Sequence, residues 1–272
     1  MGKKAAETDG KHMFAEERRR KITAYVQEKT RVTVDELCDV FDVSPATVRN
    51  DLNQLHEEGQ LKRTHGGAIA NTKVGFELFS EQKDKMNQIE KQMIAREAVK
   101  LVHEGDSIAL DSGTTVMELA KLLGSFKNLR VVTWDLAIAA WLDMHTQVSL
   151  FFIGGEVRKG HHYTTGHTFR DFLPKLNVDI FFMSANGIDA VQGITTPQVE
   201  TAMIKEMILQ GSARAYLLSD STKIGKVAFV KFADLRDVEL LITDDGCDEE
   251  SISRIQNAGT RVQIVKIPET KN

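Results

Sequence analysis

The sequence predicts an α/β protein of two domains, an N-terminal winged helix-turn-helix and a C-terminal domain built on a parallel sheet. Three helical patterns and a glycine-containing hairpin occupy the chain up to residue 70. From residue 106 onward, apolar strand segments alternate with helical segments, which is typical of parallel sheets with helices on both faces. We expect residues 1–13 to be a disordered leader, 14–72 the winged helix-turn-helix, 73–105 a linker and connecting helix, and 106–268 the α/β domain.

The expected N-terminal helices are marked by apolar stripes and by end signals. The first runs from about residue 15 to residue 29. Ser44 and Pro45 begin the third, because serine caps free backbone amides and proline at the first helical position has no amide to lose. Gly59 ends that helix as a left-handed cap. A stripe of helical spacing marks the second helix: Val34, Leu37, Cys38 and Phe41.

The third helix and the following hairpin carry the side chains that contact DNA. The N-terminal residues of a recognition helix lie nearest the bases in the major groove. The hairpin, with its turn near Gly66 and Gly67, adds basic residues that reach phosphates or the minor groove. The stripes alone fit any three-helix module, but the cap, the polar helix face and the basic hairpin together favour DNA binding. The expected DNA-binding residues are Ser44, Thr47, Arg49, Asn50, Lys62, Arg63 and His65.

The charge of the chain limits how DNA could be held. The net charge is −4, and residues 11–66 contain ten basic and ten acidic side chains. Affinity for DNA must therefore come from positive charge gathered on one face. No apolar run approaches the ~20 residues that span a bilayer, and the N-terminus lacks the apolar segment of a signal peptide. These features predict a cytoplasmic protein with no membrane partner.

The C-terminal domain is expected to contain six strands, at residues 107–110, 130–133, 148–153, 179–184, 215–219 and 239–243. Helices are expected at residues 116–123, 137–144, 169–176, 200–210 and 250–258. Before the first strand, residues 76–102 are charged and helix-prone. Their apolar stripe fits either core packing or a dimer contact, and core packing is the simpler interpretation.

Four of the expected strands end in small, polar or cationic residues, at the edge where such sheets bind ligands. Residues 111–115 open a helix, where backbone amides and hydroxyls favour an anion. Gly154 and Gly155 with Arg158, then residues 186–187, and then residues 220–223 follow the other strands. Each motif is weak alone, since a serine- and threonine-rich turn before a helix is often only a cap. Together they indicate a phosphate-bearing ligand.

Residues 34–37, 43–52 and 61–68 together resemble the N-terminal signature of DeoR-type bacterial regulators. That family commonly has two arginines before the Asp-Leu pair of the third helix, whereas this chain has Asn50 at the second position. Residues 76–265 are similar to the family's sugar-phosphate sensor, which shares its fold with ribose-5-phosphate isomerase. The resemblance therefore covers nearly the whole chain.

The resemblance implies a phosphorylated sugar as the effector. It implies that residues 111–115 form the phosphate loop and that Lys223 is its cationic partner. The family usually has Thr-Asn after the second strand, where this chain reads Thr133, Trp134 and Asp135, so a bulky ring and an acid lie near the pocket. The implied effector-binding residues are Asp111, Ser112, Gly113, Thr114, Thr115, Gly154, Gly155, Arg158, Asn186, Gly187, Glu200, Lys205 and Lys223.

The shared fold makes an isomerase-like enzyme the alternative function. Sugar isomerisation needs a positioned general base, usually a carboxylate. The acidic cluster of the isomerase would fall at residues 185–189, where Asp189 alone keeps a carboxylate, and its lysine segment is replaced by residues 193–197. The binding residues are kept and the catalytic ones are not, so we expect a regulator that is not an enzyme.

The predicted function is a DNA-binding transcription regulator that represses a carbohydrate-utilisation operon and leaves its operator when a phosphorylated sugar binds, with activation as the other direction of control. A homo-oligomer, a dimer or larger, would bind half-sites about one helical turn apart. No cofactor or metal is expected. His161, His162 and His167 have no cysteine or carboxylate at ligand spacing, and we expect them in an exposed loop.

Overall fold

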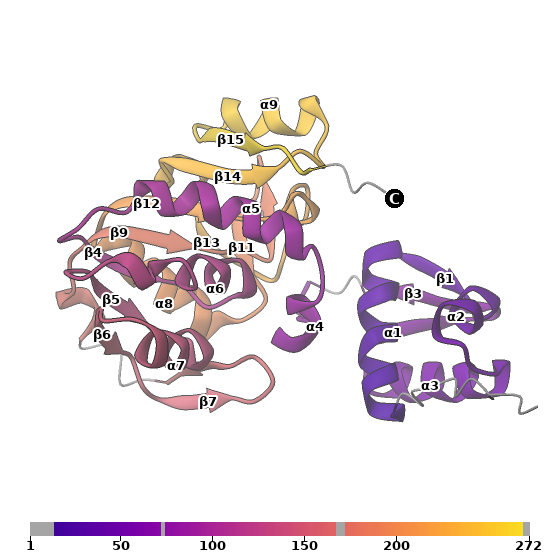
Figure 1. Ribbon diagram of the computed structural model, residues 1–272. Coiled ribbons are helices and arrows are strands. Elements are labelled where there is room, and N and C mark those ends of the chain that lie inside the picture. Colours follow the sequence, from indigo (N-terminus) through magenta and orange to yellow (C-terminus); the bar gives the residue numbers. More distant parts are fainter. Residues whose placement is uncertain (1–13, 72–73, 167–171, 269–272) are drawn as a thin grey trace, which may run out of the picture. The chain divides into compact units, whose positions relative to one another are not determined.

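The computed structural model describes residues 14–71, 74–166 and 172–268 of the chain. Contacts divide it into two compact units, with the division between Thr72 and Lys73 (Figure 1). The leader expected over residues 1–13 lies outside the described residues, as does His167. No helix in the described ranges is long and apolar enough to cross a membrane.

The N-terminal unit is a winged helix-turn-helix, as predicted. Its three helices pack with an antiparallel sheet of strand order β1-β3-β2, in which β2 and β3 form the wing. A Cβ atom at Gly67 would lie 2.0 Å from the carbonyl oxygen of Val32, so only glycine lets β3 approach β1 this closely. The elements are α1 (Ala15–Lys29), β1 (Arg31–Thr33), α2 (Val34–Phe41), α3 (Pro45–Glu57), β2 (Leu61–Thr64) and β3 (Gly67–Ala70).

Capping side chains set the helix ends of this unit. Thr33 and Glu36 form a capping box at the start of α2. Ser44 accepts a hydrogen bond from the amide of Thr47 at 3.2 Å and so caps α3, as its place before Pro45 predicts. Gly59 follows α3 with φ +71°, which confirms the left-handed end. The helix boundaries of the N-terminal unit could therefore be predicted from local chemistry.

The C-terminal unit is built on a seven-stranded sheet of order β15-β14-β12-β9-β4-β5-β6, and every pair in it is parallel. The sequence predicts six of these strands and misses the last one along the chain, β15. The strands are β4 (Ser107–Leu110), β5 (Arg130–Thr133), β6 (Ser149–Phe152), β9 (Val178–Met183), β12 (Ser212–Leu218), β14 (Leu240–Asp244) and β15 (Arg261–Val265).

Helices cover both faces of this sheet and give it two apolar cores. The helices α5, α6 and α7 lie on one face, while α8 and α9 pack on the other (Figure 1). Ile94, Ala95 and Ala98 of α5 are fully buried in the core on the face that α5, α6 and α7 cover. This confirms core packing for the apolar stripe that precedes the first strand of the sheet. The helices are α4 (Ser80–Asp84), α5 (Gln88–Ala98), α6 (Thr114–Ala120), α7 (Leu136–His145), α8 (Val199–Gln210) and α9 (Glu249–Asn257).

Short 3-10 turns complete the unit and correct one prediction. Where a helix is expected over residues 169–176, the described part contains only the turn η4 (Leu173–Lys175). Pro174 lies inside it and has no amide to donate to a longer helix. The other turns are η1 (Val99–Leu101), η2 (Leu123–Ser125), η5 (Ser221–Lys223) and η6 (Leu235–Asp237).

Two small antiparallel sheets follow the carboxyl ends of the main strands, and the sequence predicts neither. One is a hairpin after β6, and the other has the order β10-β11-β13 and begins after β9. Both small sheets lie beyond the carboxyl ends of the strands of the main sheet. Their strands are β7 (Glu156–Arg158), β8 (Tyr163–Thr165), β10 (Gly187–Asp189), β11 (Gly193–Thr196) and β13 (Val230–Ala233).

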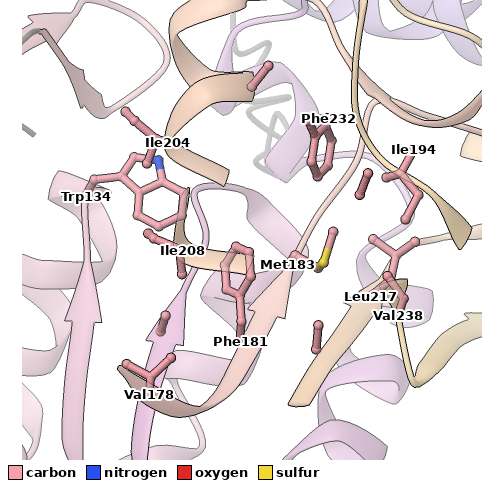
Figure 2. Packing of buried hydrophobic residues seen from close by; sticks show 14 of the residues in the cluster. Trp134, Val178, Phe181, Met183, Ile194, Ile204, Ile208, Leu217, Phe232 and Val238 are labelled. Carbon is pink, nitrogen blue, oxygen red and sulfur yellow. The ribbon is translucent and has the colours of Figure 1, made fainter. Parts of the chain in front are cut away.

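Trp134 follows β5 and is fully buried in the core on the α8 face. Figure 2 shows its indole beside Ile204 and Ile208 of α8 and above Phe181 of β9, whose ring centroid lies 6.2 Å away. The indole nitrogen has no hydrogen-bond partner among the described residues. The bulky ring that the sequence places near the pocket is therefore directed into the core.

Candidate functional site

The start of α3 presents the DNA-contacting residues expected on that helix. Ser44, Arg49 and Asn50 are exposed, while Thr47 is half-buried, with its hydroxyl 2.9 Å from that of Ser44. The buried stripe of Val48 and its neighbours lies on the opposite side of the helix. These exposed side chains lie at the N-terminal end of α3, the part of a recognition helix that lies nearest the bases in helix-turn-helix proteins.

The wing carries the remaining expected residues on β2 and the turn. Lys62 and His65 are exposed, and Arg63 is half-buried. Arg63 donates a hydrogen bond to the side-chain oxygen of Asn53 on α3. This contact links the wing to the recognition helix, so Arg63 orients the two elements relative to each other.

A buried ion pair holds α3 against α1, and the sequence analysis did not identify it. Asp51 is 4% exposed, and its carboxylate accepts from Nε of Arg18 at 2.6 Å, with Nη1 of Arg19 at 3.7 Å. The sequence contained a signal for this ion pair, since Asp51 lies three residues after Val48 on the buried face of the helix. A buried carboxylate needs a cation, and the basic cluster at the start of α1 supplies it.

In the C-terminal unit, the loop after β4 is built on a second buried ion pair. Asp111 accepts from Nζ of Lys205 at 2.6 Å and from the amide and hydroxyl of Ser184 at 2.7 and 3.0 Å. Its other oxygen accepts from the amide of Ser112 at 2.7 Å. Asp111 and Lys205 are both expected site residues, and the structure brings them together. Because they neutralise each other, they support the loop from below.

The rest of this loop turns into α6. Gly113 has φ +139°, and a Cβ atom there would lie 3.1 Å from Oγ of Ser184. Thr114 is half-buried and Thr115 is buried, in the first turn of the helix. The amides of Ser112 and Gly113 already donate to Asp111 and Asp135, and the half-buried Thr114 begins the first turn of α6.

Asp135 after β5 lies against the same loop. Its carboxylate accepts from the amides of Ala137 and Ile138 at 2.8 and 3.0 Å, and also from the amide of Gly113. Burial raises the pKa of Asp135 to about 6, and the charge of Asp111 adds to the increase. The acid that the sequence places near the pocket is therefore in contact with the candidate phosphate loop.

The strand ends after β6 and β9 contribute glycines and one cation. Gly154 and Gly155 are exposed before β7, and Arg158 at the end of β7 is half-buried. A Cβ atom at Gly187 would lie 2.5 Å from the carbonyl oxygen of Lys226, so glycine lets the segment after β12 approach β10. Asn186 accepts from the hydroxyl of Thr196 at 3.3 Å.

The segment after β12 carries the expected cation Lys223. Asp220 is 3% exposed; burial opposes its ionisation, yet Lys223 lowers the pKa of its carboxyl below the ordinary value. Asp220 also accepts from the side-chain amide of Asn87, before α5, at 3.1 Å. Lys91 of α5 is 4% exposed and burial lowers its pKa to about 8. The sequence analysis identified neither Asn87 nor Lys91.

The remaining expected residues are Glu200 and the histidines between β7 and β8. Glu200 is exposed on the first turn of α8, the helix that carries Lys205. His161 was expected in an exposed loop, and this is wrong, because its side chain is only 6% exposed, while its neighbour His162 is exposed. Within the described residues, no three His, Cys, Asp or Glu side chains are grouped to hold a metal.

Asp189, the carboxylate considered for an isomerase base, forms a turn between β10 and β11. It accepts from the amides of Val191 and Gln192 at 2.9 and 2.8 Å. These bonds give it a local structural role in the turn.

Family models match both units of the chain. One described as the DeoR-like helix-turn-helix domain matches residues 18–74, and one described as the DeoR C-terminal sensor domain matches residues 86–245. The chain belongs to the DeoR family. It is a DNA-binding transcriptional regulator and not an enzyme.

DeoR-family relatives match over nearly their full length. The HTH-type transcriptional regulator GlpR of Haloferax volcanii is 35% identical over 251 residues, which cover 92% of this chain and 98% of GlpR. The HTH-type transcriptional repressor GlcR of Bacillus subtilis is 30% identical, with 96% and 100% covered. A ribose 5-phosphate isomerase structure from Methanocaldococcus jannaschii matches with a TM-score of 0.38 and 17% identity, over 50% of this chain and 54% of that one.

Proposed function

We propose that this DeoR-family regulator represses a carbohydrate-utilisation operon and leaves its operator when a phosphorylated sugar binds the C-terminal unit. The observation that carries the proposal is the convergence of strand ends on one loop. The loop after β4 is bonded to Ser184 after β9, to Lys205 of α8 and to Asp135 after β5. Segments distant in sequence thus meet where a parallel sheet binds ligands.

The chemistry of this edge suits a phosphate. The amides and hydroxyl at the start of α6 can donate hydrogen bonds, and Arg158 after β6 and Lys223 after β12 supply cations at the same carboxyl edge of the sheet. Asp111 adds little repulsion because Lys205 neutralises it. Under this proposal, six of the expected effector residues have assigned roles. Gly113, Thr114, Arg158 and Lys223 contact the ligand, while Asp111 and Lys205 shape the loop.

At the operator, α3 reads base edges and the wing contacts the backbone. The exposure of Arg49 and Asn50 near the start of α3 supports contacts in the major groove, and the exposure of Lys62 and His65 on the wing supports contacts to phosphates. We include in the proposal that the protein acts in the cytoplasm as a homo-oligomer on repeated half-sites, because a single recognition helix covers only a few base pairs.

The test is a thermal-unfolding screen of pentose and hexose monophosphates, followed by operator binding with each stabilising compound. A ligand that binds the folded state raises the unfolding temperature. Lys223→Ala should keep operator affinity and require a higher sugar-phosphate concentration for release. The matched control is Lys127→Ala, an exposed lysine before β5 at the opposite end of the sheet, which should respond as the wild type does. An unchanged response in Lys223→Ala would refute the assigned pocket.

A further inference from the structure

The segment that leads from residue 76 through α4 and α5, here called the connector, is docked on the hairpin β7–β8 by a buried carboxylate. Glu77 is in the connector, and its side chain is 7% exposed. It accepts from Nζ of Lys83 at 2.8 Å and from the hydroxyl of Tyr163 at 3.3 Å. Nη2 of Arg158 lies 3.7 Å and Nδ1 of His161 3.6 Å from the same carboxylate oxygen.

The charges around Glu77 come from two sides. Burial opposes its ionisation, but Lys83, His161 and Arg158 lower the pKa of Glu77 to about 2. Burial lowers the pKa of His161 to about 4, so its ring is neutral near pH 7. Lys83 belongs to the connector itself. Arg158 is therefore the charged link between the connector and the hairpin.

Contacts at both ends fix the connector over the candidate effector segments. The ring of Phe79 lies where a Cβ atom at Gly160 would approach it to 2.5 Å, and the amide of Ser80 donates to the carbonyl of Gly160 at 2.9 Å. Further along, Asn87 donates to Asp220 beside Lys223. The connector thus spans from the Arg158 hairpin to the Lys223 segment.

The Glu77 cluster also adjoins the candidate phosphate loop. Tyr163, which donates to Glu77, pairs through its backbone with Asp135. Asp135 in turn accepts from the amide of Gly113. A continuous path of contacts therefore leads from the loop after β4 to the carboxylate that holds the connector.

We propose that Glu77 is an internal competitor for the anionic group of the effector. In the effector-free protein its carboxylate engages Arg158, and a sugar phosphate that binds Arg158 displaces it and releases residues 76–86 of the connector, while α5 stays in the core. The inference rests on the proposed function and adds the means by which the ligand acts. Glu77 keeps Lys83 as its partner after displacement, because both lie in the connector.

The geometry favours exchange. Charge-assisted nitrogen–oxygen bonds are usually about 2.7–2.9 Å long, and a guanidinium can bind a phosphate through two of them. The distance from Arg158 to Glu77 is 3.7 Å, so this pairing is a loose one. A phosphate that approaches Arg158 closely forms the stronger interaction, and the connector loses its charged link to the hairpin.

The test compares Glu77→Gln with the wild type and with Glu81→Gln in the full-length protein. The amide keeps the shape of the side chain and removes its charge. Glu81 is the matched control, because it lies four residues further along the connector, on α4, with its side chain 46% exposed, and bridges to Lys85 at 3.1 Å. We expect Glu77→Gln to bind the operator more weakly without ligand. It should also bind the stabilising sugar phosphate about tenfold more tightly, equivalent to about 1.4 kcal/mol.

Amide hydrogen exchange over residues 76–86 supplies a second measurement. In the wild type, the sugar phosphate should accelerate exchange in this segment, and Glu77→Gln should show fast exchange before any ligand is added. Tyr163→Phe, which removes the hydroxyl donor to Glu77, should shift exchange in the same direction and serves if Glu77→Gln does not fold.

The outcomes separate the two proposals. If no phosphorylated compound binds the wild type, the proposed function fails and this inference fails with it. If a compound binds but has the same affinity for Glu77→Gln, or leaves exchange in the connector unchanged, the inference alone is overturned. An equal effect of Glu81→Gln would also overturn it, because the result would then reflect charge in general.

Discussion

Two buried carboxylates show how single residues set the geometry of both units. Asp51 joins α3 to α1 through Arg18, and Asp111 joins the loop after β4 to α8 through Lys205. Removing one partner of a buried pair leaves the other charge without compensation, which typically costs about 3–5 kcal/mol. Neither carboxylate needs to touch DNA or effector to matter, since each determines where the contacting residues lie.

Asp135 gives a prediction at the residue scale that depends on pH. Burial raises its pKa to about 6, above its ordinary value of 3.8. A carboxyl with a raised folded-state pKa contributes stability below pH 3.8 that is lost as pH rises through about 6. Asparagine also caps a helix but does not titrate. The free energy of unfolding of Asp135→Asn, relative to wild type, should therefore increase between pH 4 and pH 7, by roughly 2–3 kcal/mol.

Urea unfolding at several pH values measures this difference. The control is Asp248→Asn at the exposed start of α9, where hydrogen bonds from Ser251 lower the pKa of the carboxyl. In the control the relative stability should fall as pH rises. Parallel profiles for Asp135→Asn and wild type would contradict the assignment of a buried, titrating acid.

Much of the site chemistry could be predicted residue by residue, but the pairing could not. Strand ends mark Asp111 and Arg158 as site residues, because small and charged types cluster there, and the family resemblance adds Lys205. That Asp111 and Lys205 bind each other depends on packing between segments 94 residues apart. His161 was misjudged for the same reason, since it is buried by contacts with the connector, which precedes it by about 80 residues.

At the scale of elements, the proposed function assigns base contacts to α3 and contacts to the DNA backbone to the wing. Arg49→Ala should reduce operator affinity by ~1–3 kcal/mol and relax base preference. Lys62→Ala should weaken operator and unrelated DNA alike and reduce the salt dependence of binding by about one phosphate contact. Fluorescence anisotropy over a salt series distinguishes the two effects.

Glu57→Ala, at the far end of α3, is the control for this pair. It should leave base preference unchanged, because only the start of the helix is placed for base edges. If Arg49→Ala left affinity for the operator unchanged, the assignment of α3 as the recognition helix would be wrong.

Long elements could be predicted from periodicity, and short ones could not. Six strands of the main sheet and all three N-terminal helices follow from apolar spacing and caps. Four of the missed strands, β1, β7, β8 and β10, have only three residues each, too few to show an alternating pattern, whereas the missed β15 has five. Their pairing is imposed by neighbours, such as β3 for β1.

At the scale of the whole molecule, the connector is the covalent route between the DNA-binding unit and the sensor. If the sugar phosphate lowers operator affinity by some factor, operator DNA must lower sugar-phosphate affinity by the same factor. Titration calorimetry with and without operator measures this, and DNA of unrelated sequence is the control. Equal sugar-phosphate affinity with and without operator would mean that the two sites are not coupled.

Trp134 gives this regulator an optical reporter. The chain has two tryptophans, and Trp141 is half-buried with its ring stacked on His145. Trp134 is enclosed by apolar side chains, so its emission lies at shorter wavelength than that of an indole in water. Its carbonyl accepts from the amide of Thr164 on β8, and the next residue contacts the phosphate loop. A ligand that moved this hairpin would therefore change the wavelength and intensity of the protein's own fluorescence, without an added label.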